Sequence, residues 1–135
     1  MYEPASPNII AIASLNSSLK WLGDETIEKV FSHKKSLTDY LIDKLRLIGC
    51  NVYAPRDLSQ HTSVVSFNVN GYLPKEIGDI LNLDFDIAVR TGFHCAPYIH
   101  SCLGTIETQG TVRASVSYFN NRSDIDSLIQ ALKEL

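Results

Sequence analysis

The segment around Cys95 holds the side chains with the most distinctive chemistry in the sequence. Arg90, His94 and Cys95 lie close together in a polar, glycine-containing stretch that ends at Pro97. Pro97 predicts the start of a short helix, so Cys95 would lie just before a helix N-terminus, where free N–H groups favour a thiolate. The thiolate is the nucleophilic form of cysteine, which makes Cys95 a candidate nucleophile. The alternative is a small buried apolar residue, the common fate of a free cysteine.

A metal site is a second interpretation of the same region. His94, Cys95, His100 and Cys102 supply two imidazoles and two thiols, the ligand types that zinc prefers. Adjacent residues such as His94 and Cys95 seldom both reach one tetrahedral ion, and the spacing lacks a Cys-x2-Cys pair. We therefore predict no metal ligands, and a free-standing metal-binding module stays open as an alternative.

Arg113 is the second centre of possible chemistry. It lies in an alternating stretch in which Val112 and Ala114 share one strand face and Arg113 takes the other. A guanidinium group holds a carboxylate through two parallel hydrogen bonds, so Arg113 is a candidate for binding a carboxylate, and Arg90 could serve the same pocket. The alternative is a salt bridge to an acidic side chain of the chain itself, which the pattern alone favours.

Helices and short strands must position these side chains. The periodicities predict helices over residues 6–22 and 24–48, strands over 52–54, 63–69, 85–90 and 111–119, and further helices that open at Pro74, Pro97 and Ser123. The expected helix ends are Ser6, Pro7 and Gly23 for the first helix, Asp24 and Gly49 for the second, and a capping box of Ser123 with Asp126 for the last. We infer an α+β fold: a two-layer sandwich with a largely antiparallel sheet and helices on one face.

Composition limits the class of protein. The 135 residues carry 12 Lys and Arg against 15 Asp and Glu, a formal charge of −3, and 44% are hydrophobic. These values describe one globular domain, residues 1–135, and argue against binding to nucleic acid or to an anionic membrane, which needs clustered basic side chains. No apolar run reaches the ~18 residues of a membrane helix. Three cysteines are too few and odd in number for a secreted disulfide framework, so we expect a cytoplasmic protein with reduced thiols.

Three motifs carry a family resemblance. They are Arg90-Thr91-Gly92-Phe93-His94-Cys95-Ala96-Pro97, then Gly110-Thr111-Val112-Arg113-Ala114-Ser115, and upstream Tyr2-Glu3-Pro4-Ala5-Ser6-Pro7-Asn8. Together they resemble the C-terminal domain of class V aminotransferases, and the segment around Cys95 resembles the cysteine desulfurase and selenocysteine lyase branch. Ala5 and Ser6 stand where the family usually has Gly-Thr. Phe93 replaces a common histidine, which leaves the substrate preference open.

The resemblance implies a role for each candidate residue. Cys95 would attack the sulfur of a cofactor-bound cysteine and become a persulfide, and Arg113 would hold the substrate carboxylate. Arg90 and His94 would line the same pocket, and Ser6 would approach the cofactor phosphate of the neighbouring subunit. The implied cofactor is pyridoxal phosphate, which acts as the electron sink for C–S cleavage.

The resemblance also implies a larger assembly. Family members carry the cofactor lysine on a large N-terminal domain, so we expect residues 1–135 to be the C-terminal portion of a longer enzyme, inactive alone. The expected partners are a cysteine or selenocysteine substrate, a sulfur-acceptor protein and a second subunit of a homodimer. A class V aminotransferase, or another pyridoxal phosphate lyase in which Cys95 is incidental, is the alternative within the family.

Overall fold

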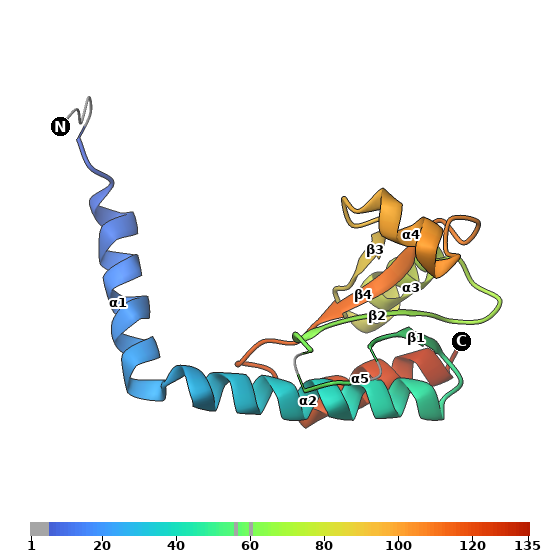
Figure 1. The fold of residues 1–135 in the computed structure, drawn as a ribbon, viewed down its shortest axis with the longest axis horizontal. Helices are drawn as coiled ribbons and strands as arrows, with labels where there is room; N and C mark the ends of the chain where they lie inside the picture. The colour runs from blue at the N-terminus through green and yellow to red at the C-terminus, as the bar shows by residue number, and fades with distance from the viewer. Residues whose placement is uncertain (1–5, 56, 60) are drawn as a thin grey trace. The chain divides into compact units, whose positions relative to one another are not determined.

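The chain forms helices and short strands that divide into two compact units. The computed structural model describes residues 6–55, 57–59 and 61–135, so part of the upstream motif, residues 2–5, lies outside it. One unit ends at Ser32, and the other runs from His33 to Leu135 (Figure 1). The helices are α1 (Ile9–Glu25), α2 (Ile27–Leu47), α3 (Pro74–Phe85), α4 (Pro97–Leu103) and α5 (Arg122–Lys133), and the strands are β1 (Asn51–Tyr53), β2 (Val64–Asn68), β3 (Arg90–Gly92) and β4 (Thr111–Ser115). Among the described residues, none of these helices has both the length and the apolar character needed to cross a membrane.

The first unit is built on α1, and its ends differ from the predicted ones. The cap is Asn8, whose side chain accepts a hydrogen bond from the backbone N–H of Ala11 at 3.0 Å, so Ser6 and Pro7 precede the helix. The helix continues through Gly23 to Glu25, because one exposed glycine costs a helix only about 1 kcal/mol. Asp24 therefore lies inside α1 rather than capping α2.

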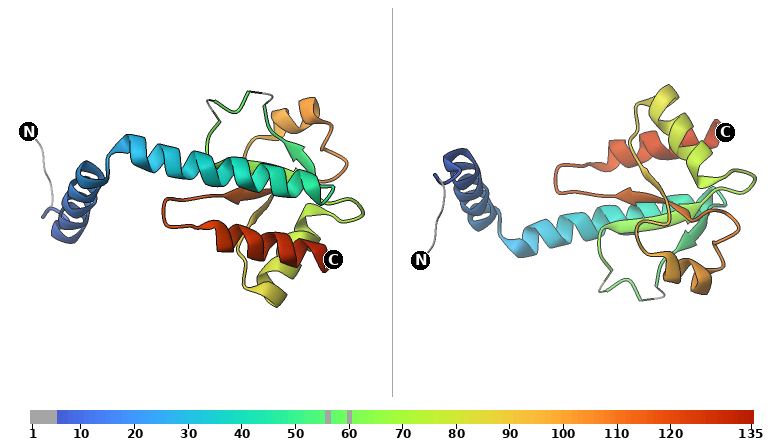
Figure 2. Two further views of the ribbon diagram at one scale, coloured as in Figure 1. Left: turned by 90° about the horizontal axis from the view of Figure 1, so that it is seen from below. Right: turned by 90° about the horizontal axis from the view of Figure 1, so that it is seen from above.

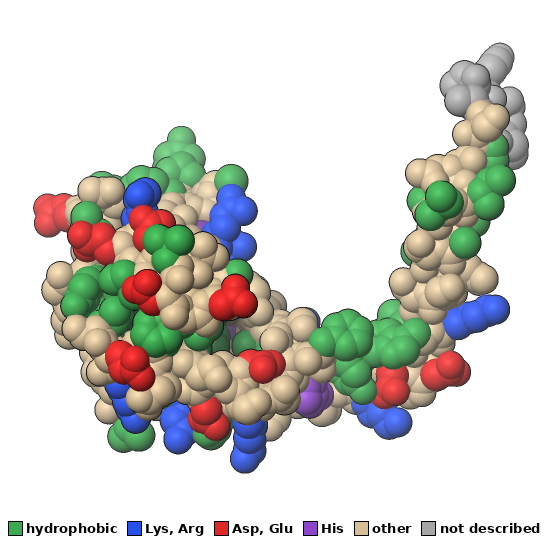
Figure 3. Space-filling model, turned by 180° about the vertical axis from the view of Figure 1, so that it is seen from behind, with side chains coloured by type: hydrophobic (Ala, Val, Ile, Leu, Met, Phe, Trp, Pro, Cys, Tyr) green, Lys and Arg blue, Asp and Glu red, His purple; other side chains and the backbone are tan. Residues whose placement is uncertain are grey.

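Apolar side chains lie exposed along α1. No described residue of this helix is buried. Figure 3 shows hydrophobic side chains gathered along it, and the exposed ones are Ile9, Ile10, Ile12, Leu15 and Leu19. Burial of an apolar face normally supplies most of a helix's stability in a protein, so α1 presents a surface that this unit alone leaves uncovered.

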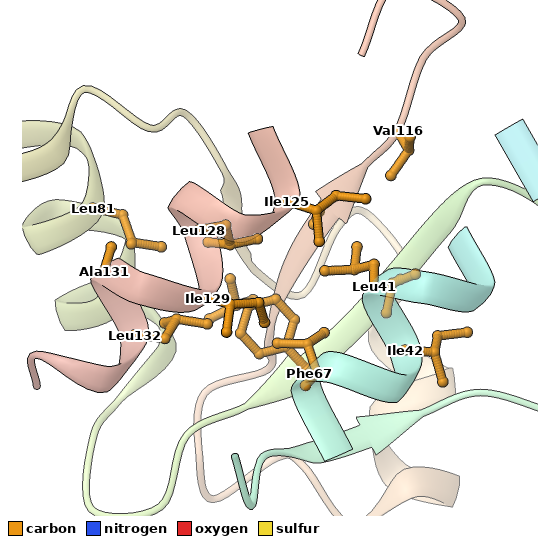
Figure 4. Close-up of a cluster of buried hydrophobic side chains, with 14 of the residues drawn as sticks. Leu41, Ile42, Phe67, Leu81, Val116, Ile125, Leu128, Ile129, Ala131 and Leu132 are labelled. Carbon is orange, nitrogen blue, oxygen red and sulfur yellow. The ribbon is translucent and has the colours of Figure 1, made fainter. Parts of the chain in front are cut away.

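The second unit contains the sheet and the core. Across the described residues the strand order is β1-β2-β4-β3, with every neighbouring pair antiparallel. Phe67 points from β2 into the space between α2 and α5 (Figure 4), where Leu41, Ile129 and Leu132 surround it. Ile77 and Leu81 of α3 are also fully buried in this cluster. This core follows from the period-two pattern of β2 and the helical spacing of α2 and α5. The strand presents one apolar face to the helices, and each helix presents one apolar stripe to the strand.

The predicted α+β sandwich is confirmed. From His33 onward, α2 lies beside α5 on one side of the sheet, and α4 lies on the other side (Figures 1 and 2). The short helix α4 therefore covers part of the polar face, so the helices do not all lie on one face as predicted.

Two predicted strands are wrong in extent, and one of them, 111–119, ends as β4 at Ser115. The alternation of Phe85, Ile87 and Val89 predicted a strand, yet Phe85 is the last residue of α3, and Asp86 ends that helix in the left-handed conformation, with φ 55°. Ile87 and Val89 still pack on the core, but the ladder begins only at Arg90. A short alternating run is compatible with a strand or with the end of a helix, because it spans too few residues to distinguish a strand period from a helical period.

The last helix also begins differently. Its capping box joins Asn121 and Asp124 rather than Ser123 and Asp126: the Asn121 side chain accepts from the N–H of Ser123 at 2.8 Å, and Asp124 accepts from the N–H of Asn121 at 3.0 Å. The hydrogen bond from the N–H of Asn121, and a second one from the side chain of Asn120 at 3.1 Å, lower the pKa of Asp124, because they stabilise its ionised form. Gly49 ends α2 as predicted, with φ 84°.

A close backbone approach fixes where β4 begins. Gly110 has φ +100°, and a Cβ atom placed on it would collide with the backbone carbonyl of Gly92. Only glycine combines this conformation with this space. The buried side chain of Asn68 donates to the Gly110 carbonyl at 3.1 Å and so holds the same point from β2.

Replacing Phe67 by Ala tests the core. Phe67 is completely buried between the helices and the sheet, so Phe67→Ala is expected to lower the free energy of unfolding by about 3–5 kcal/mol. Urea unfolding followed by circular dichroism measures this loss. Leu83→Ala is the matched control, because Leu83 is 78% exposed on α3; an equal loss in both variants would contradict this core.

Candidate active site

A row of side chains crosses the polar face of the sheet. The antiparallel register pairs Tyr53 with Ser66, Ser66 with Arg113, and Arg113 with Arg90. Directly paired residues share a sheet face, and Val112, the neighbour of Arg113 along β4, points into the core. The row therefore lies opposite the core, and the structure brings Arg90 and Arg113 together on adjacent strands.

Arg113 carries a positive charge that no acidic side chain in the described part of the chain neutralises. The salt bridges found there join Lys and Asp residues four apart on α2 and on α3, so the alternative of an internal salt bridge does not hold for the described residues. The Nε atom of Arg113 is buried without a hydrogen-bond partner, which costs about 1–3 kcal/mol. Like charges directly opposite each other also destabilise a sheet. An anionic ligand at Arg113 and Arg90 would offset both costs.

A cavity of about 730 Å³ lies over this face of the sheet. Its polar lining includes Ser66, His94, Thr111 and Arg113, and its apolar lining includes Val52, Ala54, Ile99 and Leu103. A few polar groups set among apolar walls are typical of sites for small molecules, in which the polar groups fix the orientation of the ligand. The predicted binding residues Arg113 and His94 thus line one cavity.

His94 is fixed in this cavity by Thr111. Its Nε2 atom lies 3.0 Å from the Thr111 carbonyl oxygen and 3.1 Å from the Thr111 hydroxyl. A carbonyl only accepts, so Nε2 carries the proton and donates, and the lone pair of the neutral ring is on Nδ1, which is buried without a partner. Burial lowers the pKa of His94, and the charge of Arg113 lowers it further, against the opposing hydrogen bond to Thr111.

Cys95 is exposed in a tight turn beside the cavity. The N–H of Ala96 donates to the Phe93 carbonyl at 2.9 Å, and the two residues between them, His94 and Cys95, have φ 52° and 59°. Non-glycine residues pay roughly 1–2 kcal/mol each for this left-handed conformation. Backbone strain of this kind concentrates at functional sites, where surrounding contacts hold it.

His100 is the residue of this region that sequence reasoning missed. The sequence suggests for His100 only the rejected part in a metal site, yet this side chain is 2% exposed. Its Nε2 lies 3.2 Å from the Phe93 carbonyl oxygen, and its Nδ1 lies 2.7 Å from the Thr105 hydroxyl. A histidine three residues after a helix-opening proline was the available signal, but its contacts follow no sequence period.

The comparisons with known proteins identify the family. A family model described as Aminotransferase class-V matches residues 1–128. The chain belongs to the class V aminotransferase family. A relative from Halobacterium salinarum named "Probable cysteine desulfurase" is 32% identical to this class V chain over 134 residues, which cover 98% of the chain and 31% of the relative. A relative of the same name from Pyrococcus abyssi is 30% identical, and the match covers 99% of the chain and 32% of that relative.

Solved structures agree with the family assignment. An apo cysteine desulfurase from Thermococcus onnurineus has a TM-score of 0.87 at 30% identity, covering 98% of this class V chain and 32% of its own. The cysteine desulfurase CsdA from Escherichia coli, in an S-sulfonic acid form, has a TM-score of 0.78 at 28% identity. This match covers 98% of the class V chain and 31% of the CsdA chain. The resemblance to the class V family and its cysteine desulfurases is confirmed, and the chain spans about a third of the length of these relatives.

Of the other candidates, Arg90 and Cys95 lie next to lining residues but do not line the cavity themselves. Ser6 is exposed and belongs to the first unit, whereas every residue of the cavity belongs to the second. Within the described ranges, no group of three or more His, Cys, Asp or Glu side chains could hold a metal ion. Cys102 is exposed, while the ring of His100 is buried and bonded within the class V chain.

Replacing Arg113 by Gln is expected to raise the pKa of His94, because loss of the guanidinium charge favours the protonated ring. NMR titration of the His94 ring measures the shift. Arg46→Gln is the matched control, since Arg46 is exposed on α2 and its charge does not influence His94.

The lowered pKa of His94 also makes the free energy of unfolding depend on pH. The folded pKa of His94 lies below its ordinary value of 6.5, so the unfolded chain binds more protons between the two values. The contribution to unfolding free energy is fully present above pH 6.5 and falls as the pH drops toward the folded pKa. A His94 pKa at or above 6.5, or one that Arg113→Gln leaves unchanged, would contradict this geometry.

Proposed function

We propose that this chain is the C-terminal portion of a pyridoxal phosphate-dependent cysteine desulfurase, inactive alone. In this proposal Cys95 accepts sulfur from the substrate, Arg113 holds the substrate carboxylate, and Arg90 and His94 complete the same pocket. The observation that carries the proposal is the unpaired Arg113, with a buried Nε, in a cavity beside an exposed cysteine. The similarity to proteins named cysteine desulfurases supports the same assignment.

The arginine pair suits an amino-acid substrate. A carboxylate accepts two hydrogen bonds from one guanidinium group, and Arg90 adds a second positive charge on the next strand. The neutral ring of His94 adds no charge that would repel the substrate ammonium group. Arg113 therefore binds and orients the substrate rather than acting on its sulfur.

Cys95 performs the sulfur chemistry. Its thiolate attacks the substrate sulfur, so that an S–S bond forms as the substrate C–S bond breaks, and the electron pair of that bond stays with the substrate carbon. The product on the chain is a Cys95 persulfide. Because the side chain is exposed, the outer sulfur is accessible to the thiolate of an acceptor protein, to which it passes without a further oxidant.

The cofactor would be held mostly outside this chain. When bound to the amino acid, pyridoxal phosphate supplies the electron sink that makes C–S cleavage feasible. The exposed hydroxyl of Ser6 fits a phosphate as a hydrogen-bond donor, and in this proposal it reaches the cofactor phosphate of the neighbouring subunit of a homodimer. In this proposal the cofactor lysine lies on an N-terminal domain outside residues 1–135.

Cys95→Ala is expected to reduce sulfur release from cysteine to the background rate in the complete enzyme. Alanine and persulfide formation, measured together with pyridoxal phosphate and cysteine or selenocysteine, give the readout. Cys102→Ala is the matched control, because Cys102 is also exposed. Normal sulfur release by Cys95→Ala would refute the role of Cys95, and amino-transfer products instead of alanine and sulfur would favour a class V aminotransferase.

Arg113→Lys is expected to raise the KM for cysteine about 10- to 100-fold, because a hydrogen-bonded pair with a charged group is worth about 1.5–3 kcal/mol and lysine cannot make both bonds. Steady-state kinetics of the complete enzyme measure the change. Arg122→Lys is the control, since Arg122 lies on α5, over the ring of Tyr40. A KM that Arg113→Lys leaves unchanged would refute the carboxylate role.

A further inference from the structure

The turn that carries Cys95 depends on the carbonyl group of Phe93. This carbonyl accepts the hydrogen bond that closes the turn, from the N–H of Ala96 at 2.9 Å. Both residues inside the turn, His94 and Cys95, have positive φ, and neither is glycine. A two-residue turn of this kind normally uses Asn-Gly or a similar pair, so other contacts must hold it.

His100 supplies a second donor to the same carbonyl. A carbonyl only accepts, so Nε2–H of His100 donates to Phe93, and in the neutral ring Nδ1 accepts the hydroxyl proton of Thr105. The ring also packs against Phe93 edge to face, with the centroids 5.1 Å apart. These contacts fix the tautomer and the orientation of a ring that solvent barely reaches.

The other partner of His100 anchors the turn to the sheet. The Thr105 carbonyl accepts from the N–H of Gly110 at 2.8 Å, and Gly110 packs on the backbone of Gly92, the last residue of β3. His100 therefore connects the turn to the point where β4 begins. β4 carries Arg113, so one chain of contacts links both parts of the candidate site.

We propose that His100 is a positioning residue for Cys95. It acts through the Phe93 carbonyl, because both of its ring nitrogens are already bonded within the chain. By holding that carbonyl it keeps His94 and Cys95 in the left-handed conformation and directs the Cys95 thiol out of the turn. The inference rests on the proposed function in one respect, the role of Cys95 as the sulfur acceptor.

Two amide substitutions separate the two hydrogen bonds of His100. The longer side chain in His100→Gln can still donate to the Phe93 carbonyl but loses the bond to Thr105. The shorter one in His100→Asn can still accept from Thr105 but loses the bond to Phe93. His33→Asn is the matched control, because it removes a histidine–carbonyl contact, to Asn120, elsewhere in the same unit.

NMR of the 135-residue chain gives the readout. Backbone scalar couplings and carbon shifts report the sign of φ at His94 and Cys95. We expect positive φ at both residues in the unaltered chain, in His100→Gln and in His33→Asn, and loss of positive φ in His100→Asn. Positive φ retained in His100→Asn, or lost in His100→Gln, would overturn the proposal.

A measurement without substitution keeps the test decisive if His100→Asn does not fold. The unaltered chain must show a His100 Nε2–H proton that exchanges slowly with water and couples to the Phe93 carbonyl carbon; its absence overturns the proposal. In the complete enzyme, His100→Asn is expected to lower kcat for sulfur release while the KM for cysteine stays unchanged, and His100→Gln to keep both. Failure of the proposed function would appear separately, as normal sulfur release by Cys95→Ala with the NMR result intact.

Discussion

The register of β4 between β2 and β3 is the constraint on which the candidate site depends. Ser66, Arg113 and Arg90 share one face only because β4 pairs in this register with both neighbours. A shift of one residue would turn Arg113 into the core and expose Val112. The register is therefore stabilised by burial on the opposite side of the sheet, where Val112 is fully buried, and the packing that stabilises the fold is the same packing that orients the arginine.

Two histidines with similar hydrogen bonds have different surroundings. His94 donates to a backbone carbonyl of β4 and leaves its second nitrogen without a partner at the cavity. His100 donates to a backbone carbonyl of the turn, and its second nitrogen is bonded to Thr105. A fully bonded ring contributes rigidity, whereas a ring with one free nitrogen can respond to a ligand. The difference comes from their neighbours and not from residue type.

The sequence alone predicted the fold class and the placement of Arg113, because both follow from alternation and helical periodicity. The apolar residues on either side of Arg113 identified its face, and the position of Cys95 before Pro97 predicted its loop. The extent of α3 was beyond the same reasoning, since Phe85, Ile87 and Val89 alternate like a strand although Phe85 is helical. The buried contacts of His100 were also beyond it, because its partners are side-chain and carbonyl groups brought close by a turn rather than by any period.

The contact between Gly110 and Gly92 fixes the start of β4, so the position of Arg113 does not depend on the tip of the loop that precedes Gly110. The chain between α4 and β4 returns to the sheet at Gly110, whose carbonyl Asn68 also holds. Thr105 is buried in this loop and bonded to His100, whereas Ile106 and Glu107 are exposed. A change of side chain at Ile106 or Glu107 would therefore leave both the contact of Gly110 with Gly92 and the position of Thr111 in place. The exposed tip of the loop can therefore differ in side-chain chemistry without moving Arg113, because the buried contacts of Thr105 and Gly110 lie between the tip and the sheet.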